Sequence, residues 1–143
     1  MGVEIDVAYE GQLRCRAKHG PSGCELTSDA PVDNCGRGES FSPTDLVGTA
    51  LGTCLLTIIG IVAERNGLDV VGTTAHVTKE MIQQPIRRIG KLAVRIIFPA
   101  EKAARLSAVD RQKLETAARH CPVHQSIHPD VEMPIEFIYP TIS

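Results

Sequence analysis

The fold is decided by the segment "SPTDLVGTALGTCLLTIIGIVAERNG", residues 42–67. Ser42 has the properties of a helix N-cap, and Pro43 suits the first helical position. Asp45 places a carboxylate near the positive end of the helix dipole. The Asn-Gly pair at the end of the segment tolerates the left-handed conformation that closes a helix. The pattern therefore predicts one long helix from Pro43 to about Arg65.

This helix is apolar on every side. Residues 46–63 carry no charge, and their number reaches the lower range for a membrane span. Three glycines and three threonines lower the hydrophobicity, however, and no cluster of Lys or Arg flanks the run. We therefore expect the central helix of a globular core, with no membrane association. Gly48 and Gly52 form a G-x-x-x-G pattern, which admits close approach of either a strand of the same chain or the matching helix of a second copy.

Segments of alternating polar and apolar residues on both sides of the helix predict strands. A capping box that starts at Ser107 predicts a second helix, and "CPVHQSI" predicts a short third one. The expected strands span about 3–9, 13–17, 24–27, 70–79, 88–98 and 131–139. This order predicts an α+β fold in a single domain, residues 1–143, with antiparallel hairpin sheets wrapped around the long buried helix.

Composition excludes several classes of function. The chain has 143 residues, 43% of them hydrophobic, with a formal net charge of −2 and no tryptophan. Proteins that bind nucleic acid usually show a basic excess and stacking aromatics, so we expect no nucleic-acid partner. The N-terminus, "MGVEIDVAYEG", has no features of a secretory signal, so we expect a cytoplasmic protein. Five irregularly spaced cysteines without a C-x-x-C pair do not indicate a disulfide framework or a zinc ribbon.

Two of these cysteines are candidates for chemistry. Cys54 lies in the middle of the long helix, where a thiol is often a small apolar core residue and has no cation nearby on its own helix. Cys121 precedes a proline that suits the first position of a new helix, and a helix N-terminus stabilises a thiolate. Alternatively, Cys121 continues the apolar face of the preceding helix. The residues alone leave both alternatives open.

Two other motifs give weaker indications. His120, Cys121, His124 and His128 have spacings that could place metal ligands on one helix face, but consecutive ligands point in different directions, so we expect no metal site. The loop "CGRGES" contains glycines and an arginine, but it lacks the spacing of a phosphate-binding loop.

In combination, "FSPTDLVGTALGTC" and the later "CPVHQSIHPDVEM" resemble the OsmC/Ohr family of thiol-dependent peroxidases that act on organic hydroperoxides. The resemblance covers nearly the whole chain in the right order. It implies an OsmC-like fold and an intertwined homodimer, in which the long helix is buried under curved sheet and the two cysteines meet at the dimer interface.

The resemblance also implies roles for residues. Cys54 would be the peroxidatic thiolate, and Cys121 would be the resolving thiol that forms a disulfide with it. An external dithiol reductant would reopen this disulfide, with no cofactor. Leu51, Leu55 and Ile58 would offer an apolar wall to an alkyl hydroperoxide. The alternative is a non-catalytic module of the same fold that senses redox state or binds a ligand or metal.

In this family an arginine near the N-terminus holds the thiolate and pairs with a glutamate just after the helix proline. Here Thr44 occupies the glutamate position, which resembles the less characterised branch of the family. Glu39 and Asp45 are the neighbouring carboxylates. For the arginine, the resemblance favours Arg37 in the loop, with Arg14 on the first hairpin as second choice.

Overall fold

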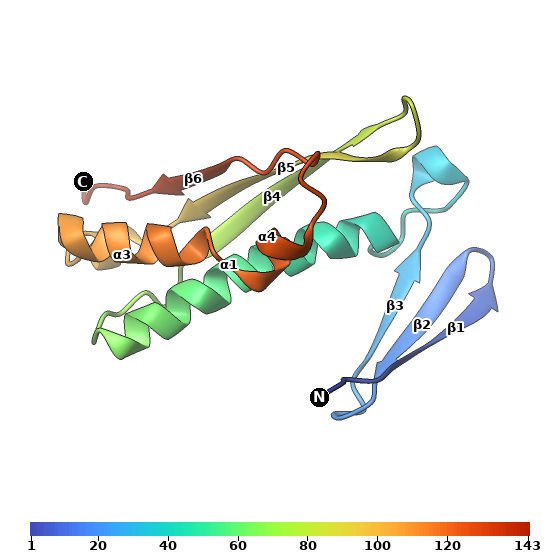
Figure 1. The fold of residues 1–143 in the computed structure, drawn as a ribbon, viewed down its shortest axis with the longest axis horizontal. Helices are drawn as coiled ribbons and strands as arrows, with labels where there is room; N and C mark the ends of the chain where they lie inside the picture. Colours follow the sequence, from blue (N-terminus) through green and yellow to red (C-terminus); the bar gives the residue numbers. More distant parts are fainter. The chain divides into compact units, whose positions relative to one another are not determined.

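The computed structural model describes residues 1–143, which separate into two units, Met1–Val47 and Gly48–Ser143. Figure 1 shows the elements of each in chain order. The longest helix, α1 (Pro43–Arg65), begins at the end of the first unit and continues through the start of the second.

The first unit contains a three-stranded antiparallel sheet in the order β1-β2-β3. Its strands are β1 (Ile5–Gly11), β2 (Arg14–His19) and β3 (Glu25–Asp29), and they confirm the expected hairpin and third strand. The apolar side chains that alternate along the N-terminal strand remain exposed: Val3, Ile5, Val7 and Tyr9 are each between 61% and 67% exposed. These side chains form an apolar row that the first unit does not itself bury.

A loop with one 3-10 turn, η1 (Val32–Asn34), returns from β3 to α1. The Asp29 N–H donates to the Phe41 carbonyl oxygen over 3.0 Å, so the end of the loop runs beside β3. Gly36 fits tightly, because a Cβ there would lie 1.8 Å from the carbonyl oxygen of Ala30. The end of the loop is thereby fastened to β3, and its middle packs against Ala30 at its start.

The start of α1 has the predicted cap. The Asp45 N–H donates to Ser42 Oγ over 3.0 Å, and the Ser42 N–H donates to the Asp45 carboxylate over 2.9 Å. This reciprocal pair provides acceptors for two backbone N–H groups that would otherwise have none at the start of the helix. The predicted helix from Pro43 to Arg65 is confirmed.

The second unit contains a sheet in the order β4-β5-β6. Strands β4 (Thr74–Ile82) and β5 (Arg88–Ile97) form the expected antiparallel hairpin. Strand β6 (Ile135–Ile138), by contrast, lies parallel to β5, so the expected antiparallel pairing holds for the hairpin but not for this strand. The reason is a helical crossover between β5 and β6, the usual connection between parallel strands.

This crossover contains three helices: α2 (Ala100–Ala103), α3 (Ala108–Ala118) and α4 (Pro122–Ser126). The sequence predicted α3 and α4 but not the single turn of α2. Ser107 and Asp110 form the expected capping box of α3. The crossover leads directly to Cys121, the residue before α4.

The core of the second unit lies between α1 and its sheet (Figure 1). Leu51, Leu55 and Ile59 of α1 are fully buried, as are Leu92 and Ile96 of β5. These α1 residues recur at spacings of four, so they form a single stripe along the helix.

The G-x-x-x-G pair belongs to this stripe. A Cβ at Gly48 would lie 3.5 Å from the side chains of Leu92 and Val77, and one at Gly52 would lie 3.0 Å from Val77. Of the two alternatives that the sequence left open, the glycines therefore serve the approach of strands in the same chain.

The opposite side of α1 is less covered. Thr53, Thr57 and Ile61 are exposed, and Ile61 is 39% exposed. By length and composition α1 is the one helix that could cross a membrane, a test that the core helix of a soluble protein also passes. Within a single chain, the expected all-round burial of α1 is limited to one stripe.

Candidate active site

Cys121 is the N-cap residue of α4. Its backbone is extended, Pro122 follows at the first helical position, and its Sγ accepts a hydrogen bond from the His124 N–H over 3.3 Å. The side chain is also fully buried. Both alternatives that the sequence offered for Cys121 therefore hold: the thiol lies at a helix N-terminus and belongs to the core.

Cys54, in the third turn of α1, lies beside Cys121. The two thiols are free and lie close enough for Cys54 to influence the pKa of Cys121, although 67 positions separate them in the sequence. Burial raises the pKa of Cys121, and the neighbouring Cys54 raises it further, while the His124 N–H opposes these effects. Cys121 therefore favours the protonated form.

The two thiols differ in access to solvent. Cys54 is half-buried, whereas Cys121 has no exposed surface. A small molecule that approaches from solvent therefore reaches Cys54 first.

The wall expected around Cys54 needs a correction. Leu51 and Leu55 are fully buried in the stripe that packs on the sheet, so they do not face solvent or a ligand. Ile58 is half-buried and follows Cys54 by four positions, and Val62 follows Ile58 by four. Residues at this spacing share a helix face, so Ile58 and Val62 continue the side of α1 on which Cys54 lies.

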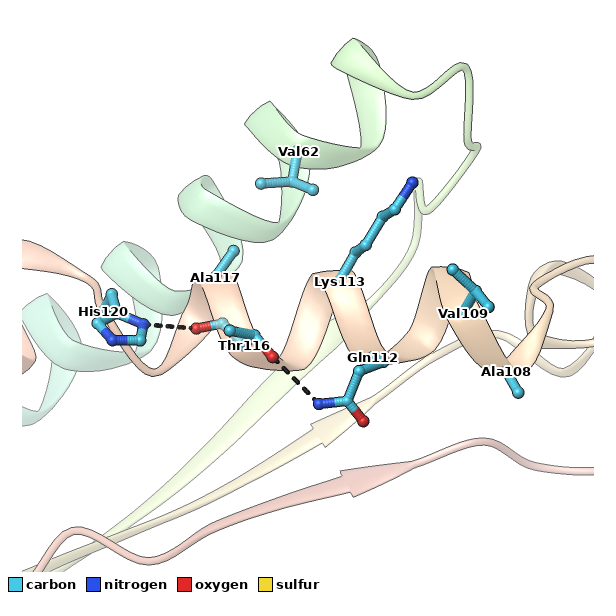
Figure 2. A pocket seen from close by; sticks show the side chains of 8 residues that line it. All are labelled: Val62, Ala108, Val109, Gln112, Lys113, Thr116, Ala117 and His120. Carbon is cyan, nitrogen blue, oxygen red and sulfur yellow. Dashed lines mark hydrogen bonds between the residues drawn. The ribbon is translucent and has the colours of Figure 1, made fainter.

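A groove of about 650 Å³ lies between α1 and α3 (Figure 2). Its lining is mostly apolar and comprises Val62, Ala108, Val109, Gln112, Lys113, Thr116, Ala117 and His120. In Figure 2, Val62 points from α1 towards the α3 side chains. His120, at one end of the lining, immediately precedes Cys121. The groove therefore meets α1 at Val62 and reaches the residue next to Cys121, while neither cysteine belongs to its lining.

In the first unit, Arg14 is surrounded by acidic groups. Its guanidinium pairs with the Glu39 carboxylate and lies 3.7 Å from the carboxylate of Asp29. Asp29 is directly opposite Arg14 in the register of β2 and β3. Its Oδ2 also accepts a hydrogen bond from the Glu39 N–H over 3.2 Å. Arg14 is thus held between a strand carboxylate and a loop carboxylate.

The other candidate arginine has a different environment. Arg37 is exposed, and its side chain makes no hydrogen bond or ion pair. The Asp45 carboxylate, near the position of the family's glutamate, bonds the Ser42 N–H in the helix cap. The carboxylates are therefore gathered around Arg14, the second choice of the sequence analysis.

The histidines near Cys121 do not converge. His120 Nδ1 bonds the Thr116 carbonyl oxygen over 2.8 Å, and His128 Nδ1 accepts from the Asp130 N–H over 3.0 Å. No group of three His, Cys, Asp or Glu side chains in residues 1–143 is arranged to hold a metal ion.

Sequence reasoning missed Asp29. Its signal lay in the strand register, because Arg14 and Asp29 are cross-strand neighbours with opposite charges. The burial of Asp29 depends on the return of the loop over β3, which the sequence pattern does not specify.

The chain is similar to one protein family and to several solved structures. A family model described as OsmC-like protein matches residues 36–136. A crystal structure from Psychrobacter arcticus 273-4, of a protein proposed to act in osmotic stress and detoxification responses, is 44% identical. It has a TM-score of 0.85, with 93% of each chain covered. No curated protein matches the sequence.

More distant structures share the fold. One is an organic hydroperoxide resistance protein from Legionella pneumophila, with 15% identity, a TM-score of 0.71, and 96% of this chain and 97% of the other covered. Another is the organic hydroperoxide resistance protein OhrB of Bacillus subtilis, with 14% identity, a TM-score of 0.62, and 96% and 98% covered.

Proposed function

The chain belongs to the OsmC-like protein family, and from this premise we propose that it is a thiol-dependent peroxidase that reduces organic hydroperoxides. The observation that carries the proposal is the proximity of Cys54 and Cys121, two free thiols close enough for one to raise the pKa of the other. Two neighbouring free thiols are the arrangement that a two-cysteine peroxidase needs. Two structures of the same fold are of organic hydroperoxide resistance proteins, which supports the choice of substrate class.

The unequal exposure of the two thiols supports a division of roles. Cys54 is half-buried and open to a substrate, so it is the peroxidatic residue. Cys121 is fully buried and its pKa is raised, so it stays protonated and is the proposed resolving residue. Because only the thiolate is a strong nucleophile, this division directs the peroxide to Cys54.

The proposed cycle has three balanced steps. The Cys54 thiolate attacks the distal oxygen of R–O–O–H and breaks the O–O bond, which gives the sulfenic acid and an alkoxide that takes a proton as R–OH. Cys121 then loses its proton and attacks the Cys54 sulfur, forming the disulfide and releasing the hydroxyl group as water. Finally, an external dithiol reduces the disulfide to two thiols and is itself oxidised. No cofactor takes part.

The apolar groove supports an alkyl group on the substrate. Ile58 and Val62 extend the Cys54 side of α1 towards this groove, and its lining is mostly apolar. Transfer of a hydrocarbon group from water to such a surface is favourable by roughly 25 cal/mol per Å² of apolar area buried. Hydrogen peroxide has no such group, so an organic hydroperoxide is the better substrate.

For the arginine that the family resemblance assigns to the thiolate, we prefer Arg14 to Arg37 because of its surroundings within the first unit. The family resemblance places an arginine paired with a carboxylate in this role. Arg14 has such partners in Glu39 and Asp29, whereas the side chain of Arg37 has none. Glu39 would thus replace the helix-start glutamate of the family, whose position is occupied by Thr44 in this chain.

A homodimer is part of the proposal. The first unit exposes the apolar face of β1, and the second leaves one side of α1 uncovered. Monomeric proteins rarely expose extended apolar surfaces, so a second copy of the chain is the proposed cover.

Turnover by three proteins tests the function: wild type, Cys54→Ser and Cys121→Ser, assayed with an alkyl hydroperoxide and a dithiol. Cys54→Ser is expected to abolish turnover, because a hydroxyl is not ionised at neutral pH. Cys121→Ser is expected to consume about one equivalent and then to stop or slow, because the sulfenic acid is no longer resolved. Equal turnover by the three proteins would refute the proposal.

The groove also supports a second candidate, a binding module of the same fold without turnover. A volume of about 650 Å³ lies within the usual range for small-molecule sites. Native mass spectrometry of the purified protein distinguishes the two functions. A retained apolar ligand together with an absence of peroxide consumption would favour the binding module.

A further inference from the structure

The residue that follows β6 connects the sheet of the second unit to helix α3. The Tyr139 ring stacks on the Phe98 ring, with the ring centroids 4.7 Å apart and the planes inclined by 8°. Phe98 occupies one face of the Tyr139 ring, and the Arg111 guanidinium lies over the ring at 4.3 Å from its centroid. Figure 1 shows the end of β6 beside the start of α3. Tyr139 therefore joins the fully buried Phe98 to a side chain of the helix.

The Tyr139 hydroxyl makes a second link to α3. It donates to Glu115 Oε2 over 2.7 Å. Glu115 follows Arg111 by four positions, so the two side chains lie on one face of the helix. Burial raises the pKa of Tyr139 and the Glu115 carboxylate raises it further, while Arg111 opposes these effects, so the hydroxyl stays protonated and able to donate. Arg111, Glu115 and Tyr139 together form the Tyr139 clamp.

The Arg111 side chain keeps its place in the clamp although one of its nitrogens is unsatisfied. Its Nη2 donates to the Ala103 carbonyl oxygen, at the end of α2, over 2.9 Å. Its Nε is buried without a hydrogen-bond partner, which is rare in native proteins. The contact with the Tyr139 ring and the bond to Ala103 therefore decide where the guanidinium lies.

No flexible joint separates the clamp from Cys121. The Arg119 N–H donates to the Glu115 carbonyl oxygen over 3.2 Å, and the Cys121 N–H donates to the Ala118 carbonyl oxygen over 3.1 Å. Backbone hydrogen bonds thus continue from the residue that Tyr139 binds to the second cysteine. A shift of α3 therefore moves Cys121.

The end of α3 is attached to β6 more loosely than its start. The Arg119 guanidinium lies 5.2 Å from the centroid of the Phe137 ring, and Arg119 is exposed. This pair has neither the hydroxyl bond nor the ring stack that the Tyr139 clamp has. The clamp is therefore the tighter of the two attachments.

We propose that Tyr139 is a positioning residue for the disulfide step, because it holds α3 where the Cys121 sulfur stays within reach of Cys54. The inference rests on the proposed function, in which Cys121 resolves the Cys54 sulfenic acid. A disulfide forms only within a narrow range of distances between the two residues, and correctly oriented groups of one chain react as if at high local concentration. Release of α3 therefore lowers the stability of the disulfide relative to the two thiols.

The experiment measures an equilibrium of the full-length protein with glutathione. The protein dithiol and oxidised glutathione give the protein disulfide and two molecules of reduced glutathione. After acid quenching and alkylation, mass spectrometry gives the fraction of chains with the Cys54–Cys121 bond. Tyr139→Leu removes the ring and the hydroxyl, and Tyr139→Phe removes the hydroxyl alone. Ile59→Val is the control, because it removes one methyl group from the buried stripe of α1 and leaves the clamp residues unchanged.

For Tyr139→Leu we expect the equilibrium constant to fall about tenfold, because looser orientation lowers the effective concentration of the thiols. This fall corresponds to a reduction potential about 30 mV higher. Tyr139→Phe should give a smaller fall. Glu115→Ala removes the same hydrogen bond, so its combination with Tyr139→Phe should have no larger effect than either change alone. Ile59→Val should destabilise the protein but leave the constant unchanged, since the equilibrium is that of the folded protein.

A wild-type equilibrium constant in Tyr139→Leu would overturn the inference. An equal fall in Ile59→Val would also overturn it, because general loosening would then explain both results. Urea unfolding checks that each variant is folded, and if Tyr139→Leu is not, Tyr139→Phe and Glu115→Ala decide. Hydroperoxide turnover by the wild type is measured separately. Absent turnover refutes the proposed function, whereas the glutathione equilibrium still decides whether Tyr139 positions Cys121.

Discussion

At the scale of single residues, the glycines of α1 differ in what surrounds them. A Cβ at Gly52 would lie 3.0 Å from the Val77 side chain, whereas one at Gly60 would meet no atom within 4 Å. Both positions are helical, so the same substitution has the same intrinsic effect on helix formation at each. The difference between them therefore reports the packing of α1 on the sheet.

We predict opposite effects for the two substitutions. Gly52→Ala should lower the free energy of unfolding, because overpacking forces the helix and β4 apart at a cost of about 1 to 3 kcal/mol. The higher helix propensity of alanine offsets part of this cost. Gly60→Ala should raise it by up to about 1 kcal/mol. Urea unfolding at one fixed protein concentration measures both. Equal changes in the two variants would contradict the close approach of β4 to α1.

The site residues were only partly predictable from the sequence. Cys54 and Cys121 stood out by their motifs, but their proximity joins positions 67 apart and depends on the crossover that precedes α4. Of the two candidate arginines, the sequence favoured Arg37 by its place before the helix. The acidic environment of Arg14 arises from strand register and a returning loop, neither of which has a local pattern.

At the scale of elements, local signals predicted most of the boundaries. The caps at Ser42 and Ser107 are hydrogen-bond pairs within four residues, so the sequence contains the whole motif. The direction of β6 is not local in this sense, because it depends on the path of residues 98–134 through the crossover. The single turn of α2 is too short to show periodicity.

Helix α1 shows how composition can mislead about burial. Its uniform apolarity predicted a helix covered on all sides, yet the chain buries one stripe and leaves Thr53, Thr57 and Ile61 exposed. Side chains that another copy of the chain covers are also apolar, so the sequence pattern reflects burial in the assembly as well as burial within one chain. The mismatch between apolarity and burial in one chain is therefore the physical argument for a partner.

At the scale of the whole molecule, the proposed partner is a second copy of the chain. The exposed alternation along β1 gives this proposal a matched test, since Asp6 and Val7 are neighbours on opposite faces of the strand. Val7→Lys places a charge on the apolar face, and Asp6→Lys places the same charge on the other face.

Light scattering coupled to size-exclusion chromatography should give a dimer mass for the wild type and for Asp6→Lys. Val7→Lys should shift towards the monomer, because a lysine ammonium is costly to bury in an apolar interface. A monomeric wild type, or dimers of equal stability in both variants, would contradict the proposed cover of this face.

The central claim is that Cys54 and Cys121 form a reactive pair within one chain. The most direct test is the intact mass of the reduced protein after about one equivalent of an alkyl hydroperoxide, followed by mapping of the disulfide. We predict a loss of two hydrogen atoms per chain and an intrachain bond between Cys54 and Cys121, with Cys15, Cys24 and Cys35 still reduced. An unchanged mass, or a bond that involves any of those other three cysteines, would contradict the account.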